Sequence, residues 1–212
     1  MKTKTSLCSC GSCSSRAFTL VELLVVMTIV IVLGSLSVTG MRSLTTSLGL
    51  SSATQALISE LTTARQTALS LDETVQVRFY QFPDSTGVTP TKEYQAIQSF
   101  RTKDGLTYTP LDKVVYLPPN IMISPNTTYS SPLGSTTATN AATTDPTLMV
   151  NGIGNNYSYV GVNFKSNGTI DPQVSAWFVT LYEKKYGTTG TPVNFTTVSV
   201  DPQNGRLRLF QP

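Results

Sequence analysis

A long apolar run near the N-terminus constrains this chain more than any other feature of its sequence. The run covers residues 18–38 and contains one charged side chain, Glu22. A helix of that length rises about 31 Å at about 1.5 Å per residue, which matches the roughly 30 Å hydrocarbon core of a bilayer. We therefore expect a membrane-spanning helix here, with a carboxylate inside it.

The charges on either side of the run predict its orientation. Lys2, Lys4 and Arg16 precede the run, and Arg42 is the next charged residue after it. Basic residues are retained on the cytoplasmic side of a membrane. We expect residues 1–17 to form a cytoplasmic leader, the apolar run to span the inner membrane, and the head that follows to lie on the extracytoplasmic side. On hydropathy alone this is an uncleaved signal anchor, because a secretory signal has a shorter apolar core followed by a small-residue cleavage site.

Glu22 argues for more than an anchor. A charged side chain at membrane depth costs about 3 kcal/mol or more, so a carboxylate retained there generally has a specific partner. The basic leader also meets the apolar run abruptly, in the order Arg16, Ala17, Phe18. From these residues alone another interpretation stays open, in which Glu22 lies at the membrane edge and its carboxylate reaches the aqueous interface.

At this junction the sequence resembles the type IV pilin and pseudopilin family. The family motif is a short basic leader, a small residue, Phe-Thr-Leu-x-Glu and a long apolar helix, and here Ala17 is followed by FTLVE over residues 18–22. The resemblance implies cleavage between Ala17 and Phe18 by a prepilin peptidase, N-methylation of Phe18, and assembly into a filament. The family nearly always has glycine before the cleaved bond, so alanine in its place predicts slower cleavage.

The resemblance also supplies a partner for Glu22. Cleavage creates an α-amino cation on Phe18, and in the family the glutamate pairs with the amino group of a neighbouring subunit. A buried ion pair adds little net stability, but a misplaced subunit would leave a desolvated charge unpaired, so the pair would set the axial register. The partners implied are prepilin peptidase, other pilin or pseudopilin subunits, the inner-membrane assembly platform and membrane lipid.

Composition excludes several classes of function. The chain has no histidine, which removes Ser-His-Asp and Cys-His catalysis and the commonest metal ligand. Of its 15 basic residues, three lie in the leader, which leaves 12 against 12 acidic residues in the rest of the chain. A neutral body is not typical of a nucleic-acid-binding protein. We expect no enzymatic activity, no cofactor, no bound metal and no nucleic-acid partner.

The chain's three cysteines, Cys8, Cys10 and Cys13, all lie in the leader. Thiolates are soft metal ligands, but three of them without a histidine or a fourth cysteine make an incomplete site. We expect all three to leave with the leader when the chain is cleaved.

Beyond the apolar run, the hydrophobic pattern predicts that the same helix continues. Apolar residues recur at steps of three and four, which is the period of an amphipathic helix. We expect one helix from about residue 18 to about residue 70, with a membrane-spanning and assembly half over 18–44 and an amphipathic half over 45–71. Glu60 and Arg65 fall on its polar face. The apolar stripe consists of Leu50, Ala53, Leu57, Leu61, Ala64, Ala68 and Leu71.

From residue 72 the pattern changes to the alternation that is typical of strands. Val75, Val77 and Phe79 share one face of a half-buried strand. A helix followed by strands predicts an α+β fold, in which the long helix packs on an antiparallel sheet in a head over 72–212. Uncharged polar residues over about 124–149 predict a surface insertion. The expected strands cover residues 74–80, 94–100, 114–117, 158–164, 174–182, 196–200 and 206–210.

Two segments of the head resemble the H-type minor pseudopilins in particular. Residues 57–79 join a helix directly to a V-x-V-x-F strand, and residues 200–207 form a glycine-containing hairpin. This resemblance implies a place in or near the tip of a secretion pseudopilus. A second class of function stays open, a signal-anchored extracytoplasmic binding domain that does not polymerise. The missing histidine disfavours the third class, an enzyme.

Overall fold

A computed structural model describes most of the chain. The described residues are 19–83, 90–135, 139–140, 154, 156–171, 177–187 and 192–211, with the backbone alone described for 36–46, 90–92, 134–135 and 139–140. The chain divides into two compact units, Met1–Ser43 and Leu44–Pro212.

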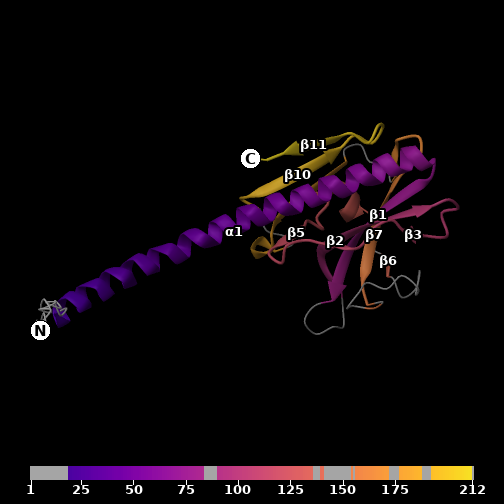
Figure 1. Cartoon of the computed structure of the whole chain (residues 1–212). Coiled ribbons are helices and arrows are strands. Elements are labelled where there is room, and N and C mark those ends of the chain that lie inside the picture. Colours follow the sequence, from indigo (N-terminus) through magenta and orange to yellow (C-terminus); the bar gives the residue numbers. More distant parts are fainter. Residues whose placement is uncertain are drawn as a thin grey trace, which may run out of the picture. The chain divides into compact units, whose positions relative to one another are not determined.

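One continuous helix, α1, extends over Leu20–Leu71 (Figure 1). It agrees with the predicted helix and passes through all three of its glycines without a break. Thr19 caps its N-terminus, because the Thr19 hydroxyl accepts a hydrogen bond from the Glu22 N–H at 3.2 Å. The helix ends where Asp72 adopts a left-handed conformation with φ of 52°, which aspartate tolerates better than most residues.

The second unit contains an antiparallel sheet with the strand order β11-β10-β9-β5-β2-β1-β7-β6 among the described residues. Strands β3 and β4 also pair with β2, and β8 pairs with β7. The predicted α+β class, with a long helix and an antiparallel sheet, is confirmed. The strands are β1 (Thr74–Pro83), β2 (Pro90–Thr102), β3 (Thr109–Pro110), β4 (Val115–Tyr116), β5 (Ile121–Ile123), β6 (Thr139–Asn140), β7 (Ser158–Phe164), β8 (Ile170–Asp171), β9 (Trp177–Glu183), β10 (Phe195–Val200) and β11 (Leu207–Phe210), and the two short helices are α2 (Ser131–Ser135) and η1 (Lys184–Tyr186).

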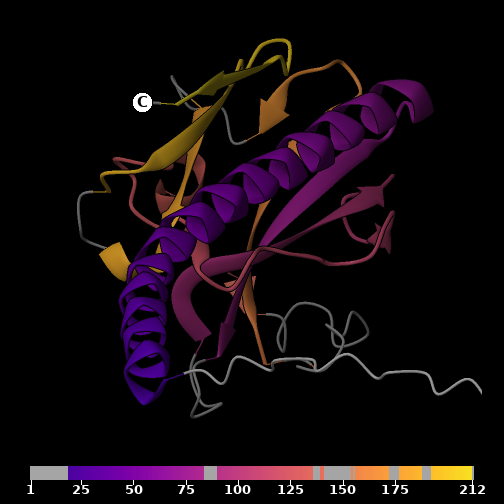
Figure 2. The same ribbon diagram turned by 60° about the vertical axis from the view of Figure 1, so that its left-hand side comes forward.

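The apolar stripe of α1 packs against the sheet, as predicted, in the second unit (Figure 2). From Leu50 to Ala68 each predicted stripe residue is at most 5% exposed. Burial of each leucine in this set stabilises the fold by about 1.5–3 kcal/mol. Leu71 is the exception at 46% exposed, because α1 ends at this residue and the chain turns away at Asp72.

Strand β1 is buried on both faces, whereas the sequence predicts burial of one. It lies between β2 and β7, and Val75, Val77 and Phe79 face the core under α1 as expected. The opposite face carries Tyr80 and Phe82, which pack in a second cluster of buried residues, most of them aromatic, from β1, β2 and the start of β7. The alternating pattern shows which residues share a face of the strand. It does not show whether residues from other strands bury the second face.

The beginning of the predicted surface insertion packs into the head instead. Ser124 and Ser130 are fully buried, and Leu133 in α2 is 2% exposed. The Thr180 N–H of β9 donates to the Ser130 hydroxyl at 3.2 Å, and the Ser124 N–H donates to the Thr180 carbonyl at 2.9 Å. These bonds satisfy polar groups that would otherwise be costly to bury. The later part of the insertion, apart from residues 139–140, lies outside the described residues.

Candidate functional site

The N-terminal turn of α1 brings together Thr19 and Glu22. Thr19 supplies both a side-chain cap for the Glu22 N–H and a carbonyl that accepts the Leu23 N–H at 3.2 Å. The sequence T-x-x-E fits the capping-box pattern, in which a glutamate follows the capping residue by three positions. An acid in the first turn is also favoured by the helix dipole, by about 0.3–1 kcal/mol. Glu22 thus has a local role in starting the helix, and its side chain is exposed.

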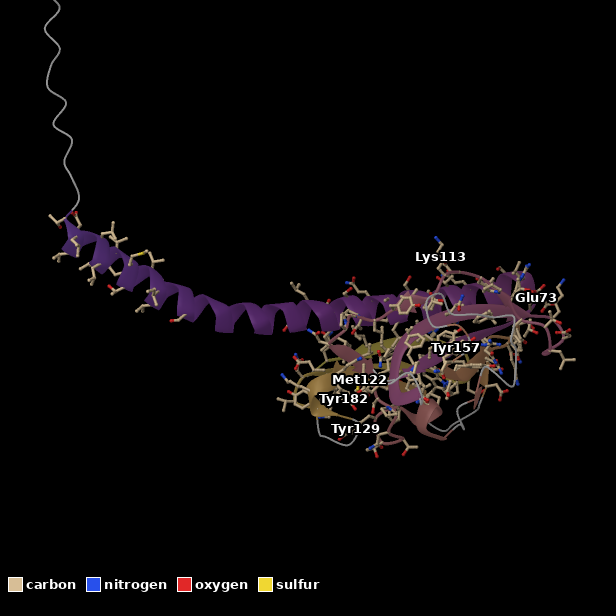
Figure 3. The ribbon with its side chains drawn as sticks, turned by 90° about the horizontal axis from the view of Figure 1, so that it is seen from below. Glu73, Lys113, Met122, Tyr129, Tyr157 and Tyr182 are labelled. Carbon is tan, nitrogen blue, oxygen red and sulfur yellow. The ribbon has the colours of Figure 1, made fainter. Side chains whose placement is uncertain are left out.

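The first unit exposes large apolar side chains on every side of α1. Figure 3 shows them projecting from both sides of the ribbon along this segment. A helix that is apolar all round is normally surrounded by protein or lipid. The residues are Leu20, Val21, Leu23, Leu24, Val25, Val26, Met27, Ile29, Val30, Ile31, Val32 and Leu33, each between 47% and 81% exposed.

The hydroxyl groups within this apolar segment are satisfied by the helix itself. Thr28 Oγ1 donates to the Val25 carbonyl at 2.8 Å, and Ser35 Oγ donates to the Val32 carbonyl at 2.8 Å. Such bonds let a hydroxyl side chain enter an apolar medium without losing a hydrogen bond. Over residues 20–35 of the helix, Glu22 is therefore the charged side chain that would need a partner in an apolar medium.

Within the part of the chain whose side chains are described, no helix meets the length and apolarity of a membrane span. The predicted span over 18–44 extends into residues whose side chains are not described. It remains a prediction.

The Prokaryotic N-terminal methylation motif matches residues 13–38 of this chain. The matched range contains the predicted cleavage junction, Glu22 and the whole apolar run. In this segment the chain carries the prokaryotic N-terminal methylation motif. The motif implies anchoring in the inner membrane, processing by a prepilin peptidase and partners among pilin subunits.

Two crystal structures are similar to this chain. They are those of the type IV minor pilin FimU from Pseudomonas aeruginosa strain PAO1, in space groups P21 and P65. Each is 16% identical with a TM-score of 0.42, and the match covers 77% of this chain and 92% and 97% of the two FimU chains. No curated protein sequence matches this chain.

The other residues predicted from the motif lie outside the described residues of the chain. Their predicted roles in cleavage, N-methylation and orientation therefore stay predictions, as does the loss of the leader cysteines. They are Lys2, Lys4, Cys8, Cys10, Cys13, Arg16, Ala17 and Phe18.

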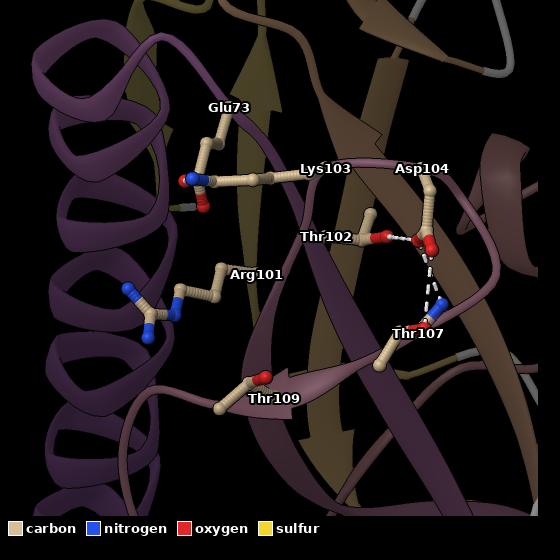
Figure 4. A pocket seen from close by; sticks show the side chains of 7 residues that line it. All are labelled: Glu73, Arg101, Thr102, Lys103, Asp104, Thr107 and Thr109. Atoms are coloured by element: carbon tan, nitrogen blue, oxygen red, sulfur yellow. Dashed lines mark hydrogen bonds and ion pairs between the residues drawn. The ribbon is translucent and has the colours of Figure 1, made fainter.

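The head has a shallow pocket beside the C-terminal end of α1 (Figure 4), with a volume of about 310 Å³. The Asp104 carboxylate accepts the N–H groups of Thr107 and Leu106 at 2.8 and 2.9 Å. These bonds lower the pKa of Asp104 to about 2, so the carboxylate stays charged and fixes the turn. Glu73 pairs with Lys103 at 3.2 Å. The carboxylates of Glu73 and Asp104 thus both have partners that stabilise the local structure. No group of three metal-binding side chains occurs in the described part of the chain.

The sequence analysis missed a buried cation on the second face of β1. Arg78 is 1% exposed, and its guanidinium carbon lies 4.2, 4.5 and 4.3 Å from the ring centroids of Phe100, Tyr108 and Tyr159. Its Nε donates to Gln76 Oε1 at 2.7 Å, while Nη2 has no hydrogen-bond partner among the described residues. Stacking of a desolvated guanidinium on aromatic rings stabilises it by about 1–2 kcal/mol per ring. The alternating pattern alone could not reveal this site, because the rings come from other strands and a loop.

Glu60 is the second polar residue whose environment was not predicted correctly from the sequence. It is 8% exposed rather than on the solvent face of α1, and it accepts a hydrogen bond from Ser99 Oγ of β2 at 2.7 Å. Burial raises the pKa of Glu60 above its ordinary value. The amphipathic pattern gives no sign of this, because only the position of β2 decides that the flank of the stripe is covered.

Proposed function

We propose that this protein is a structural subunit, a minor pseudopilin or pilin-like protein, of a type II secretion pseudopilus or a type IV pilus-like filament. A prepilin peptidase cleaves it between Ala17 and Phe18, and Phe18 is then N-methylated. The observation that carries the proposal is Glu22, an exposed carboxylate in the first turn of α1, where large apolar side chains of residues 20–33 are exposed on all sides of the helix. It lies within the matched methylation motif.

The position of Glu22 in α1 favours a partner from another subunit. After cleavage, the cation on Phe18 would lie at the positive end of the helix dipole, which disfavours it there. Glu22 in turn would be desolvated once the apolar segment is covered by lipid or protein. The pairing of Glu22 with the amino group of a neighbouring chain relieves both problems. An unpaired buried charge costs about 3–5 kcal/mol, so subunits shifted along the axis would be rejected.

The second half of α1 belongs to the folded head, since its apolar stripe forms part of the head's core. The helix-to-strand junction over residues 57–79 supports an H-type minor subunit, because α1 passes into β1 through two residues, Asp72 and Glu73. We assign the protein no catalytic role.

Mass spectrometry of the full chain from its native membrane tests the proposal. The expected N-terminal peptide begins at N-methylated Phe18. A chain that retains residues 1–17, with Cys8, Cys10 and Cys13, would overturn the filament proposal and favour a signal-anchored binding domain. Cryo-electron microscopy of sheared filaments, with an antibody against the head, would then show whether the processed subunit is incorporated.

A further inference from the structure

Strand β11 forms one edge of the sheet (Figure 1) and pairs with β10 alone among the described strands. In the antiparallel register Val200 faces Leu207, Ser199 faces Arg208 and Val198 faces Leu209. An edge strand presents unpaired backbone groups that can pair with a further strand. The side chains and charges of β11 decide which strand that can be.

The turn before β11 fixes which backbone groups are free. The Asp201 N–H donates to the Arg206 carbonyl at 2.9 Å, and the Gly205 N–H donates to the Asp201 carbonyl at 2.7 Å. This is the pattern of a glycine bulge, in which Asp201 and Arg206 occupy a bonded position of the ladder. Bonded and non-bonded pairs alternate along an antiparallel ladder. Arg208 therefore bonds to β10, while the N–H and C=O groups of Leu207 and Leu209 point away from it. The free edge thus offers two donors and two acceptors with the spacing of a regular strand.

Apolar side chains lie on both faces of this free edge. Leu209 is 47% exposed and Phe210 is 54% exposed. They lie on opposite faces because side chains alternate along a strand. Leu207 packs at the margin of the core, so Leu209 extends the same apolar face beyond it. A strand added here would gain backbone hydrogen bonds and burial of apolar surface together.

The charge of the edge restricts its occupant. Arg206 and Arg208 are both exposed, and the ion pairs found among the described residues are made by lysines rather than by these arginines. Pairing of β11 with the β11 of a second copy would bring the arginines of both chains onto one short ladder, where like charges destabilise. An added segment with an acid beside Arg208 and apolar residues beside Leu207 and Leu209 would pair the guanidinium charge and bury both leucine side chains.

We propose that β11 is a strand-addition site that takes an extended segment of another protein in which acidic and apolar residues alternate. Backbone hydrogen bonds supply affinity in this mode of recognition, and the side chains beside them supply specificity. The proposal does not depend on the filament function, because it uses only residues of the head.

A short blocked peptide that alternates valine and glutamate, with a fluorescent label, is a suitable probe. Fluorescence anisotropy with the full chain in detergent micelles should show binding at least about tenfold tighter than for the valine–lysine peptide, and binding that weakens with salt. Hydrogen exchange of the Leu207 and Leu209 amides should slow by about tenfold or more at saturation. Micelles without protein correct for direct adsorption of either peptide.

Two variants locate the site. Leu209→Pro removes an outward N–H and keeps the bonds to β10, as proline at a free edge allows, so peptide binding should fall about tenfold or more while circular dichroism is unchanged. Arg208→Glu should reverse the preference between the two peptides. Arg101→Glu, the same change at an exposed arginine of β2, should leave the preference as it is.

Equal binding of both peptides would overturn the proposal, as would a preference that Arg208→Glu fails to reverse. Unchanged exchange at Leu207 and Leu209 would place any bound peptide elsewhere and would also overturn it. If Leu209→Pro fails to fold, the Arg208→Glu result and the exchange data decide alone.

Discussion

At the scale of single residues, Glu22 has one role that the structure shows and one that we propose. Its N–H is capped by Thr19 within one chain, whereas its carboxylate would serve a neighbouring chain. Glu22→Val keeps the backbone N–H and the cap, and removes only the charge. We expect membrane insertion and cleavage to be unchanged, and incorporation into filaments to fall by about tenfold or more, since a lost buried ion pair costs several kcal/mol.

Immunoblotting of membrane and sheared-filament fractions measures both effects of Glu22→Val. Thr19→Val is the matched control, because it removes the capping hydroxyl and leaves the carboxylate in place. It should weaken the helix start by about 1 kcal/mol and affect assembly less. Incorporation of Glu22→Val at the wild-type level would refute the assembly role of the carboxylate.

In the proposed maturation, Ala17 precedes the bond whose cleavage creates the Phe18 amine. Ala17→Gly places the family's usual residue before the cleaved bond, and we expect faster processing of the full chain. Pulse-chase labelling followed by mass spectrometry would measure the fraction that begins at Phe18 with time. Equal rates for the two chains would show that the methyl group of alanine is no obstacle to the peptidase.

At the scale of elements, α1 is bonded to the turn between β10 and β11. Arg65 Nε donates to the Asn204 carbonyl at 2.9 Å, and the neighbouring Gly205 has φ of 65°. A Cβ on Gly205 would lie 2.8 Å from Arg65 Cδ. Gly205→Ala should therefore destabilise the head by about 1–2 kcal/mol, part from the left-handed backbone and part from displacement of Arg65.

A double-mutant cycle separates the two parts. In an Arg65→Ala background, Gly205→Ala should retain only the backbone part, about 1 kcal/mol. Denaturant unfolding of the full chain, followed through the single tryptophan, Trp177, would measure both values. Trp177 is 1% exposed in the core and reports on the packing of α1 against the sheet. Strictly additive values would rule out the contact between Arg65 and the turn as a cause.

The contact between α1 and β2 predicts a dependence of stability on pH. Burial raises the folded-state pKa of Glu60 above the ordinary 4.5. The folded state then binds this proton more tightly than the unfolded state, so the contribution of Glu60 is most favourable below about pH 4.5 and is lost as the pH rises through the folded-state pKa. Glu60→Gln keeps an acceptor for Ser99 and should be more stable than the wild type at pH 7, but equally stable at pH 4.

Thermal unfolding of both chains at the two pH values measures this difference. Ser99→Ala is a useful companion variant, because without the Ser99 hydroxyl the charged form of Glu60 loses a donor and the pH dependence should become steeper. A Glu60→Gln chain whose stability changes with pH as much as the wild type would show that other groups dominate between pH 4 and pH 7.

The elements that the sequence predicted share a long hydrophobic period. The stripe of α1 from Leu50 to Ala68 repeats over several turns, and β7 alternates from Val160 to Phe164, so local spacing suffices for both. Strand β5 has three residues and no visible period, yet it pairs with both β9 and β2. Glu60 and Arg78 are buried by groups far away in sequence. Their burial follows from tertiary neighbours and leaves no mark on the local pattern.

The same distinction between local pattern and tertiary neighbours applies to the candidate site. Its residue types were readable from the sequence, because a carboxylate in an apolar run is anomalous wherever the run folds. The Thr19 cap of Glu22 also follows from local spacing, as T-x-x-E is itself a helix-start pattern. The free edge of β11 was not readable, since the identity of an edge strand depends on the order of all the others.

At the scale of the whole molecule, the two units use apolar residues in opposite ways. In the first unit the large apolar side chains of residues 20–33 are exposed, while the buried hydrophobic residues of the described chain begin at Leu50. The body beyond the leader is also electrically balanced, so net charge neither drives nor opposes folding of the head. Among the described residues, the head's core therefore takes no side chain from the segment that would enter the membrane or the filament.

A chain that begins at Leu44 should consequently fold on its own without detergent. Every residue of both buried clusters lies at or beyond Leu50, so we expect a cooperative thermal transition within a few degrees of that of the full chain in detergent, a shift of about 1 kcal/mol or less. Trp177 emission and near-ultraviolet circular dichroism would measure it. The same truncation with Leu57→Ala, which empties part of the core, should lose about 2–5 kcal/mol and shows that the assay detects damage to the head. If the truncated chain is unfolded while the full chain is folded, residues before Leu44 contribute to the stability of the head. That result would refute the hypothesis that the head folds independently of the assembly segment.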